Sequence, residues 1–172
     1  VLSAHSLVNS YQEEDLKRVF WQYGELRTAP ALAKTIVAAR AEKPIETTFE
    51  LKAVLSKHLP NGRENKILAQ IYQAIRIEVN QEIEVLKEFL LQTPELLSEG
   101  GRLSVISYHS LEDRLVKNFL KRGSFSGEIE KDFFGNIQKP FTEINRHPIV
   151  AGPEECALNS RARSAKLRIA VK

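Results

Sequence analysis

The sequence predicts an α/β fold in which a helical first part precedes a small sheet with flanking helices. Two observations support this fold class. Up to about residue 92, apolar side chains recur every three or four positions, which is the period of helices that bury one face. After residue 100, the segments 102–107, 141–145 and 165–171 are apolar or alternate between apolar and polar residues, as strands do. A chain of 172 residues is long enough to bury a core.

Three helices are predicted before residue 60. The first (about 11–23) and the third (from Thr47 to about residue 59) begin with the spacing of a capping box, in which two side chains bond to each other's backbone N–H. The residue pairs with this spacing are Ser10 with Glu13, and Thr47 with Glu50. The second helix opens at Thr28, has Pro30 in its first turn and ends before Pro44.

A fourth and long helix is predicted over about residues 64–92. Its apolar positions keep the helical period throughout: Leu68, Ile71, Tyr72, Ile75, Val79, Ile83, Leu86 and Leu90. A helix of this length can serve two layers, so we place a domain boundary inside it, near 65–75, and expect domains at 1–70 and 71–172. Thr93-Pro94 then restarts a short helical turn.

The second part begins with a strand at 102–107, which Gly100-Gly101 introduces. A helix follows from Ser110 to about Arg122, with Ser110 as its expected cap and Gly123 as its stop. Residues 123–140 predict an irregular loop. The strands 141–145 and 165–171 complete the sheet, with a short helix starting at Pro153 between them.

The end of the 102–107 strand is the candidate functional site. In open α/β sheets, ligands bind beyond the carboxyl ends of strands, and Ser107, Tyr108, His109 and Ser110 lie there. The phenol of Tyr108 can stack on a base, and the imidazole of His109 can carry a proton near neutral pH. The structural alternative is a histidine that only supports the fold.

Basic residues suggest an anionic partner. The net charge is +3, the pI is about 9.0, and the segment from Asn159 onward contains five cations and no acidic residue. These cations are Arg161, Arg163, Lys166, Arg168 and Lys172. Nucleic acid is one interpretation, and a solvated outer face of the last strand is the other.

Arg76 and Asn80 form a second polar pair, one turn apart on the long helix. From one face of that helix they can bind a phosphate or a base edge. Alternatively, they pair with the nearby Glu78, Glu82 and Glu84.

Several classes of protein are excluded by what the sequence lacks. Apolar stretches are too short to span a membrane, and no basic region precedes an apolar core at the start. The single cysteine, Cys156, excludes an internal disulfide, and motifs for phosphate loops or metal sites are missing, so we expect no metal and a cytoplasmic location. The chain opens on Val1 and contains no methionine, which favours a fragment of a longer chain.

Five motifs spread over nearly the whole chain carry a family resemblance. They are Tyr23-Gly24-Glu25 followed by Arg27; Pro44-Ile45-Glu46-Thr47-Thr48 with Glu50-Leu51; Gln73 to Asn80; Gly100-Gly101-Arg102-Leu103 through Ser110 to Arg114; and Asn159 to Arg168. With these motifs the sequence resembles the bacterial 16S ribosomal RNA cytosine-N4 methyltransferases of the MraW type.

The resemblance implies a partial Rossmann-like sheet of an S-adenosylmethionine-dependent methyltransferase, namely its last three strands with their helices, plus an inserted all-α domain for recognising RNA. That family binds S-adenosylmethionine through its N-terminal half, which the resemblance places outside this chain. We therefore expect no cofactor to bind this chain alone, and no activity from it. The competing hypothesis is a non-enzymatic RNA-binding or ribosome-assembly module.

Site residues follow from the strand-end position and from this resemblance, with 16S ribosomal RNA of the small subunit as the partner. The expected catalytic residues are Ser107 and His109. The expected RNA-binding residues are Arg27, Arg76, Asn80, Tyr108, Arg161 and Arg163. A sheet without its neighbouring strand leaves the 102–107 strand with an open edge, which predicts a homodimer.

Overall fold

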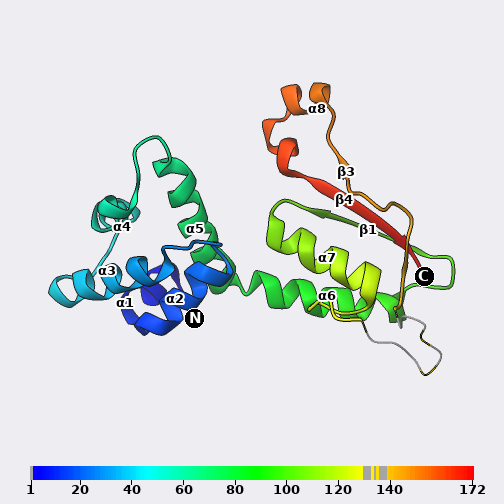
Figure 1. The fold of residues 1–172 in the computed structure, drawn as a ribbon, viewed down its shortest axis with the longest axis horizontal. Helices are drawn as coiled ribbons and strands as arrows, with labels where there is room; N and C mark the ends of the chain where they lie inside the picture. The colour runs from blue at the N-terminus through cyan, green and yellow to red at the C-terminus, as the bar shows by residue number, and fades with distance from the viewer. Residues whose placement is uncertain (1, 130–132, 134, 136–138) are drawn as a thin grey trace. The chain divides into compact units, whose positions relative to one another are not determined.

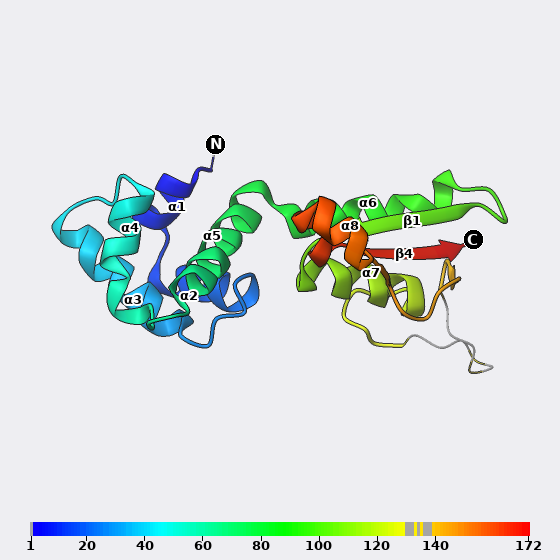
Figure 2. The same cartoon turned by 90° about the horizontal axis from the view of Figure 1, so that it is seen from above.

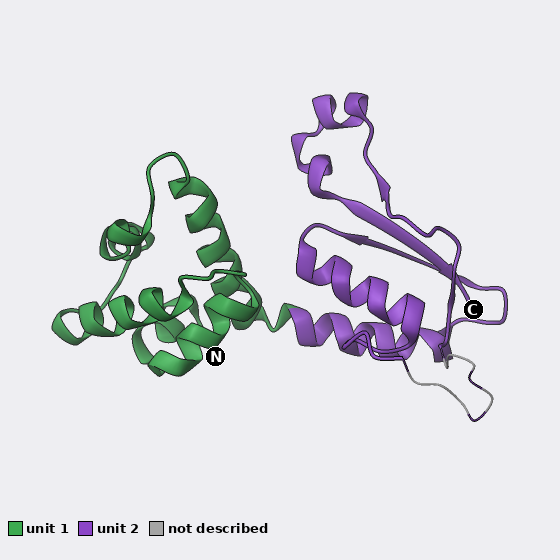
Figure 3. Cartoon of the chain, in the orientation of Figure 1, with its two compact units in different colours: residues 1–82 green, residues 83–172 purple. Residues whose placement is uncertain are grey.

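The computed structural model describes residues 2–129, 133, 135 and 139–172, and the chain divides into two compact units (Figures 1 and 3). Unit 1 comprises Val1–Glu82 and unit 2 comprises Ile83–Lys172. Each unit buries its own hydrophobic core. No helix in the described part of the chain is long and apolar enough to cross a membrane.

Unit 1 is all helical. Its elements are α1 (Ala4–Ser10), α2 (Glu13–Gln22), α3 (Ala29–Glu42), α4 (Thr48–Val54), the 3₁₀ turn η1 (Ser56–His58) and α5 (Glu64–Asn80). α2 packs on both α3 and α5, as the two views in Figures 1 and 2 agree. The largest fully buried side chains of its core are Phe20, Leu7, Leu16, Leu32, Ile36, Leu55 and Ile71.

Two of the predicted helix starts are confirmed. α3 begins at Ala29 with a proline in its first turn. α4 has the predicted capping box, in which the Thr47 hydroxyl accepts from the Glu50 N–H at 3.1 Å and the Glu50 carboxylate accepts from the Thr47 N–H at 3.0 Å. These local signals are read directly from the sequence because both partners lie within one turn.

The capping box predicted at Ser10 and Glu13 is wrong. Ser10 is the last residue of α1, a helix that the sequence analysis did not predict and that has its own capping box between Ser3 and Ser6. α2 starts at Glu13 without a side-chain cap. Its first turn holds three acidic residues, which complement the positive end of the helix in place of a cap.

The long helix predicted over 64–92 is interrupted at Gln81. This residue has a left-handed backbone (φ 52°, ψ 35°) that ends α5, and α6 (Glu82–Leu96) follows. The apolar period continues across the break because Ile71 and Ile75 belong to the core of unit 1, whereas Leu86 and Leu90 belong to that of unit 2. Pro94 lies inside α6, so the separate turn predicted there is also wrong.

The compact units divide after Glu82, whereas the sequence analysis placed the domain boundary between residues 70 and 71. The difference arises because the interruption occurs at a glutamine. Left-handed residues at helix ends are usually glycine, so the sequence carries no signal for this one. Which of the predicted domains recognises RNA and which belongs to a methyltransferase core stays a proposal.

Unit 2 combines a sheet with helices. After α6 come β1 (Arg102–Ser107), α7 (Ser110–Arg122), β2 (Thr142–Glu143), β3 (Ile149–Val150), α8 (Pro153–Leu158), the 3₁₀ turn η2 (Ser160–Ser164) and β4 (Lys166–Val171). The strands predicted at 102–107 and 165–171, the helix from Ser110 and the short helix at Pro153 are confirmed. Within 141–145 only β2 forms, and β3 was not predicted.

β4 is the central strand of the sheet. Among the described residues the order is β1-β4-β2, β3 also pairs with β4, and all pairings are antiparallel. β1 and β4 lie side by side over their full length, from Arg102 opposite Val171 to Ser107 opposite Lys166 (Figure 2). In the part of the chain that the structure describes, β1 therefore has β4 on one side and an open edge on the other.

The two faces of this sheet differ. α6 and α7 lie on the same side of the strands (Figure 1), where Leu103 and Ala170 join Leu90, Val116 and Phe119 in the core. On the opposite face, the register places the apolar side chains Ile106, Leu167 and Ile149 in one row across three strands, and Ile106 is 57% exposed. As far as the described residues show, the sheet thus has one covered face and one open apolar face.

The loop predicted over 123–140 is described only in part. Residues 123–129, 133, 135, 139 and 140 contain no helix or strand, which agrees with the prediction. Residues 130–132, 134 and 136–138, including the second phenylalanine of the Phe133-Phe134 pair, lie outside the described residues.

Candidate functional site

The candidate site is the turn between β1 and α7. Ser107, the last residue of β1, is buried, and its Oγ donates to the backbone oxygen of Lys166 on β4 at 3.5 Å. Tyr108 is 58% exposed. His109 precedes the first residue of α7 and has an extended backbone. One buried hydroxyl, one exposed ring and one imidazole are thus presented in sequence at the strand end.

His109 caps α7, and the cap predicted at Ser110 is wrong. The imidazole Nδ1 accepts from the Glu112 N–H at 3.4 Å, while the Glu112 carboxylate accepts from the N–H groups of Tyr108 (2.9 Å) and His109 (3.4 Å). Serine is the commoner capping residue, so the sequence favoured the neighbouring position. An accepting Nδ1 places the proton of the neutral ring on Nε2.

The second ring nitrogen of His109 is held against the same carboxylate. Nε2 is buried and lies 3.2 Å from Oε1 of Glu112, without the geometry of a hydrogen bond to any described residue. Burial raises the pKa of Glu112, but the His109 ring and the backbone N–H of Tyr108 lower it by more, so this pKa lies below its ordinary value. Glu112 is therefore a carboxylate at neutral pH, and it fixes the turn.

A buried ion pair lies directly beneath this turn. Asp113 of α7 accepts from Arg168 Nε at 2.7 Å and Nη2 at 3.3 Å, and Lys166 Nζ lies 3.3 Å from the same carboxylate. Arg168 is only 5% exposed. Burial raises the pKa of Asp113, but Arg168 and Lys166 lower it by more.

Sequence reasoning missed this pair. It considered Arg168 for an anionic partner or for a solvated strand face, and neither interpretation describes a buried, paired arginine. A signal was present in β4, where Arg168 shares its strand face with Ala170 and not with Leu167 and Ile169. The partner, Asp113, lies 55 residues away, so only the fold identifies it.

Two of the expected RNA-binding residues lie at the same end of the sheet as the turn. Arg161 and Arg163 belong to η2, and both are exposed. Because Ser107 pairs with Lys166, the start of β4 and the η2 segment before it lie beside the end of β1 (Figure 1). Unit 2 thus brings together Ser107, Tyr108, His109, Arg161 and Arg163.

The other expected RNA-binding residues belong to unit 1. Arg27 is exposed between α2 and α3. Arg76 and Asn80 both donate to the carboxylate of Glu82, with Arg76 Nε at 2.7 Å and Asn80 Nδ2 at 3.1 Å from Oε1. The structural alternative of pairing with a nearby glutamate is therefore observed for both residues, and these contacts help to hold the break at Gln81.

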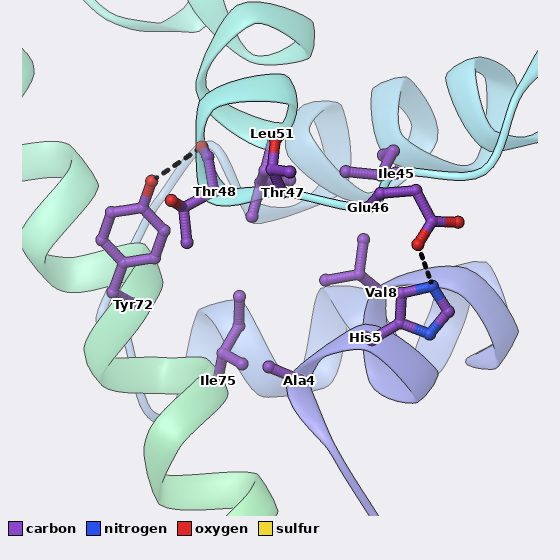
Figure 4. A pocket seen from close by; sticks show the side chains of 10 residues that line it. All are labelled: Ala4, His5, Val8, Ile45, Glu46, Thr47, Thr48, Leu51, Tyr72 and Ile75. Carbon is purple, nitrogen blue, oxygen red and sulfur yellow. Dashed lines mark hydrogen bonds and ion pairs between the residues drawn. The ribbon is translucent and has the colours of Figure 1, made fainter.

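Unit 1 also contains a small pocket of about 110 Å³ between α1, α4 and α5 (Figure 4). Apolar side chains form most of its wall, and its polar groups pair with one another at the rim. His5 Nε2 lies 3.2 Å from Glu46, and the Tyr72 hydroxyl donates to the backbone oxygen of Thr48 at 3.2 Å. The His5–Glu46 pair is at the rim and the wall is mostly apolar, so we keep the turn after β1 as the candidate site.

The comparisons with known proteins agree with the predicted resemblance. Residues 1–172 match the model of the MraW methylase family. The chain is 64% identical to a protein of Flavobacterium johnsoniae, 61% to one of Christiangramia forsetii and 52% to one of Phocaeicola vulgatus, each named ribosomal RNA small subunit methyltransferase H. Each alignment covers 99% of this chain and 56% of the relative, so the chain spans about half the length of the curated relatives it matches. The chain belongs to the MraW methylase family.

Proposed function

We propose that this chain is the C-terminal part of an S-adenosylmethionine-dependent enzyme that methylates the N4 atom of a cytidine in 16S ribosomal RNA. The relatives' names and the share of their length that the chain covers support this proposal. The structural observation that carries it is the one-sided sheet of unit 2. Doubly wound α/β enzymes cover both faces of their sheet with helices, whereas among the described residues α6 and α7 pack on one face and Ile106 is exposed on the other (Figure 1).

In this proposal the rest of the enzyme packs against the open face of the sheet and the edge of β1. The open face presents Ile106, Leu167 and Ile149, and β1 has an unpaired edge among the described residues. A further strand beside β1 and helices over this row would complete a two-sided sheet. The turn at Ser107–His109 would then lie at an inner strand end, where α/β enzymes bind ligands.

The cofactor does not fit the residues present here. An adenosine group is commonly held by a free acidic side chain at a strand end. In unit 2 the two acidic residues at the end of β1 are already engaged, Glu112 by the turn and Asp113 by Arg168. We therefore assign S-adenosylmethionine to the part of the enzyme outside this chain and derive no step through it.

The residues of this chain act on the RNA base. The exocyclic amine of cytidine is a weak nucleophile because its lone pair is delocalised into the ring, so catalysis depends on holding an unstacked base in line for attack. In our proposal the exposed ring of Tyr108 lines the base pocket, and Ser107 or His109 orients the amine or relays its proton. Arg161 and Arg163 bind phosphates, and so do the unit 1 residues Arg27, Arg76 and Asn80.

Calorimetric titration with S-adenosylmethionine tests the proposal that the cofactor binds to the part of the enzyme outside this chain. We expect no binding by the 172-residue chain and binding by the longer protein. Micromolar affinity of the isolated chain would show that the cofactor site is here after all.

Mass spectrometry of ribosomal RNA treated with the longer protein tests the reaction. We expect N4-methylcytidine in 16S RNA. In the cell, this reaction would take place in the cytoplasm, where ribosomes are assembled. A methyl group on another atom or another base would refute the cytosine-N4 assignment. RNA binding without any methyl transfer would favour the alternative, an RNA-binding or assembly module.

A further inference from the structure

Trp21 is the only tryptophan of the chain, and it lies 56% exposed on α2. α2 buries Leu16, Val19 and Phe20 in the core of unit 1, so its fold does not need a second large aromatic ring on the outer face. The indole and Pro30 of α3 form the apolar part of a surface hollow of about 360 Å³. The other residues lining this hollow are Glu14, Lys17, Arg18 and Gln22.

The charges around this hollow favour an anionic ligand. Lys17 is half-buried and paired with Glu14 at 2.8 Å, and Arg18 is paired with Glu78 at 2.7 Å. Two more cations are near Pro30 in the sequence and are exposed: Arg27 precedes α3, and Lys34 lies one turn after Pro30 on the same helix face. Among the described residues, neither Arg27 nor Lys34 makes a hydrogen bond or an ion pair with a side chain.

The composition of the hollow argues against a protein partner. Protein interfaces concentrate apolar groups at their centre and exclude charges from it. Here four of the six lining residues are polar or charged, and Trp21 and Pro30 are the two apolar ones. An exposed aromatic ring with cations beside it is instead an arrangement that binds single-stranded nucleic acid, with bases stacked on the ring and phosphates near the cations.

We propose that Trp21 is a stacking platform for one unpaired base of an RNA strand, with Lys17, Arg27 and Lys34 around the adjoining phosphates. This inference rests on the proposed function, because it takes ribosomal RNA as the ligand of the chain. It adds a contact on unit 1 that is separate from the base to be methylated. Stacking on an indole does not depend on the identity of the base, so Trp21 contributes affinity and not sequence selectivity.

Fluorescence provides a direct test, because every change in tryptophan emission of this chain comes from Trp21. The 172-residue chain is titrated with a labelled single-stranded RNA while label anisotropy and tryptophan emission are recorded together. We expect emission to be quenched with the same midpoint as the anisotropy change. Binding seen by anisotropy without any change in emission would refute the stacking proposal and leave the proposed function intact. Absence of binding in both signals would refute RNA recognition by this chain, and the stacking with it.

Substitutions give the second test. We expect Trp21→Ala to weaken RNA binding about ten-fold, as loss of one stacked base does, and Trp21→Phe to retain most of the affinity. Phe49→Ala is the matched control, because Phe49 is 84% exposed on α4 and lies away from the hollow. Circular dichroism verifies that each variant is folded. An affinity of Trp21→Ala within two-fold of the parent would overturn the proposal.

The salt dependence of RNA affinity tests whether the cations contact phosphates. Lys34→Ala should reduce the slope of log affinity against log salt by about one phosphate contact. Lys57→Ala, which removes an exposed lysine from η1, should leave the slope unchanged. Equal slopes for both variants would remove Lys34 from the site.

Discussion

His109 and Glu112 stabilise the turn after β1, a role that their side-chain chemistry alone does not predict. The imidazole of His109 closes the first turn of α7, and Glu112 ties the backbone of Tyr108 and His109 to it. A titratable ring at a strand end is therefore compatible with two roles, capping and proton handling. Substitution separates them because asparagine is a good cap but cannot carry the proton.

We predict that His109→Asn in the longer protein keeps its thermal stability but loses most of its turnover. His109→Ala should lose most of its turnover and also be less stable. The alanine variant should be less stable by about 1 kcal/mol, the usual contribution of a cap. Turnover with methylated RNA as the readout and a thermal melt of each variant distinguish the roles. Near-parental activity of both variants would eliminate His109 from catalysis.

The carboxylate of Asp113 balances the charge of Arg168, which is buried in unit 2. Asp113→Ala leaves Arg168 buried without its partner, and we expect a loss of about 3 kcal/mol or more in the free energy of unfolding. Urea unfolding at pH 7 measures this loss. Glu99→Ala is a suitable control, since its carboxylate is largely exposed and lies 3.9 Å from Lys172.

The same pair predicts a pH dependence. The pKa of Asp113 is lower in the folded than in the unfolded chain, so its stabilisation is complete at neutral pH and disappears as the pH falls through the folded-state pKa. The parent should lose stability below about pH 4, and part of this loss should be missing in Asp113→Asn. Identical acid profiles of the two proteins would contradict the assignment.

At the scale of elements, the break at Gln81 determines where the two units separate. A left-handed backbone is unfavourable for a residue with a side chain and favourable for glycine. We predict that Gln81→Gly is more stable than Gln81→Ala by about 1 kcal/mol. The same two substitutions at Gln92, inside α6, should give the opposite order by a similar amount. Thermal melts of the four variants provide the measurement, and the same order at both positions would refute the explanation.

The elements that the sequence predicts well are those whose signals are local. The capping box at Thr47, the proline at the start of α3 and the apolar run of β1 each identify an element from a few neighbouring residues. The missed elements lack such signals. α1 is short and largely polar, β3 has two residues, and Gln81 is not a glycine.

The candidate site shows the same limit. The strand–turn–helix at Ser107–His109 is predicted correctly, whereas the functional role of this turn stays a prediction. The ion pair of Asp113 with Arg168 was not predicted. The two residues are distant in sequence and meet only through the pairing of β1 with β4 and the packing of α7. The pairing of Arg76 and Asn80 with Glu82 depends on the break at Gln81, which the sequence did not reveal.

At the scale of the whole molecule, the open edge of β1 and the apolar face beside it predict self-association of the isolated chain. We expect light scattering to detect dimers at high concentration. Ile106→Lys should reduce this association without unfolding the protein, because the Ile106 side chain is already exposed. Leu158→Lys on α8 is the control, with an equally apolar side chain that lies outside the sheet. A strictly monomeric parent protein would contradict the prediction.

The central place of β4 has a consequence for how the protein is made. β4 follows β1, β2 and β3 in the sequence, yet each of these strands pairs with it. Unit 1 precedes unit 2 in the chain and makes its contacts within itself, so it can fold while unit 2 is being synthesised. The edges of β1, β2 and β3 that pair with β4 stay unpaired until β4 has emerged. During that interval the growing chain is most exposed to aggregation and to chaperones.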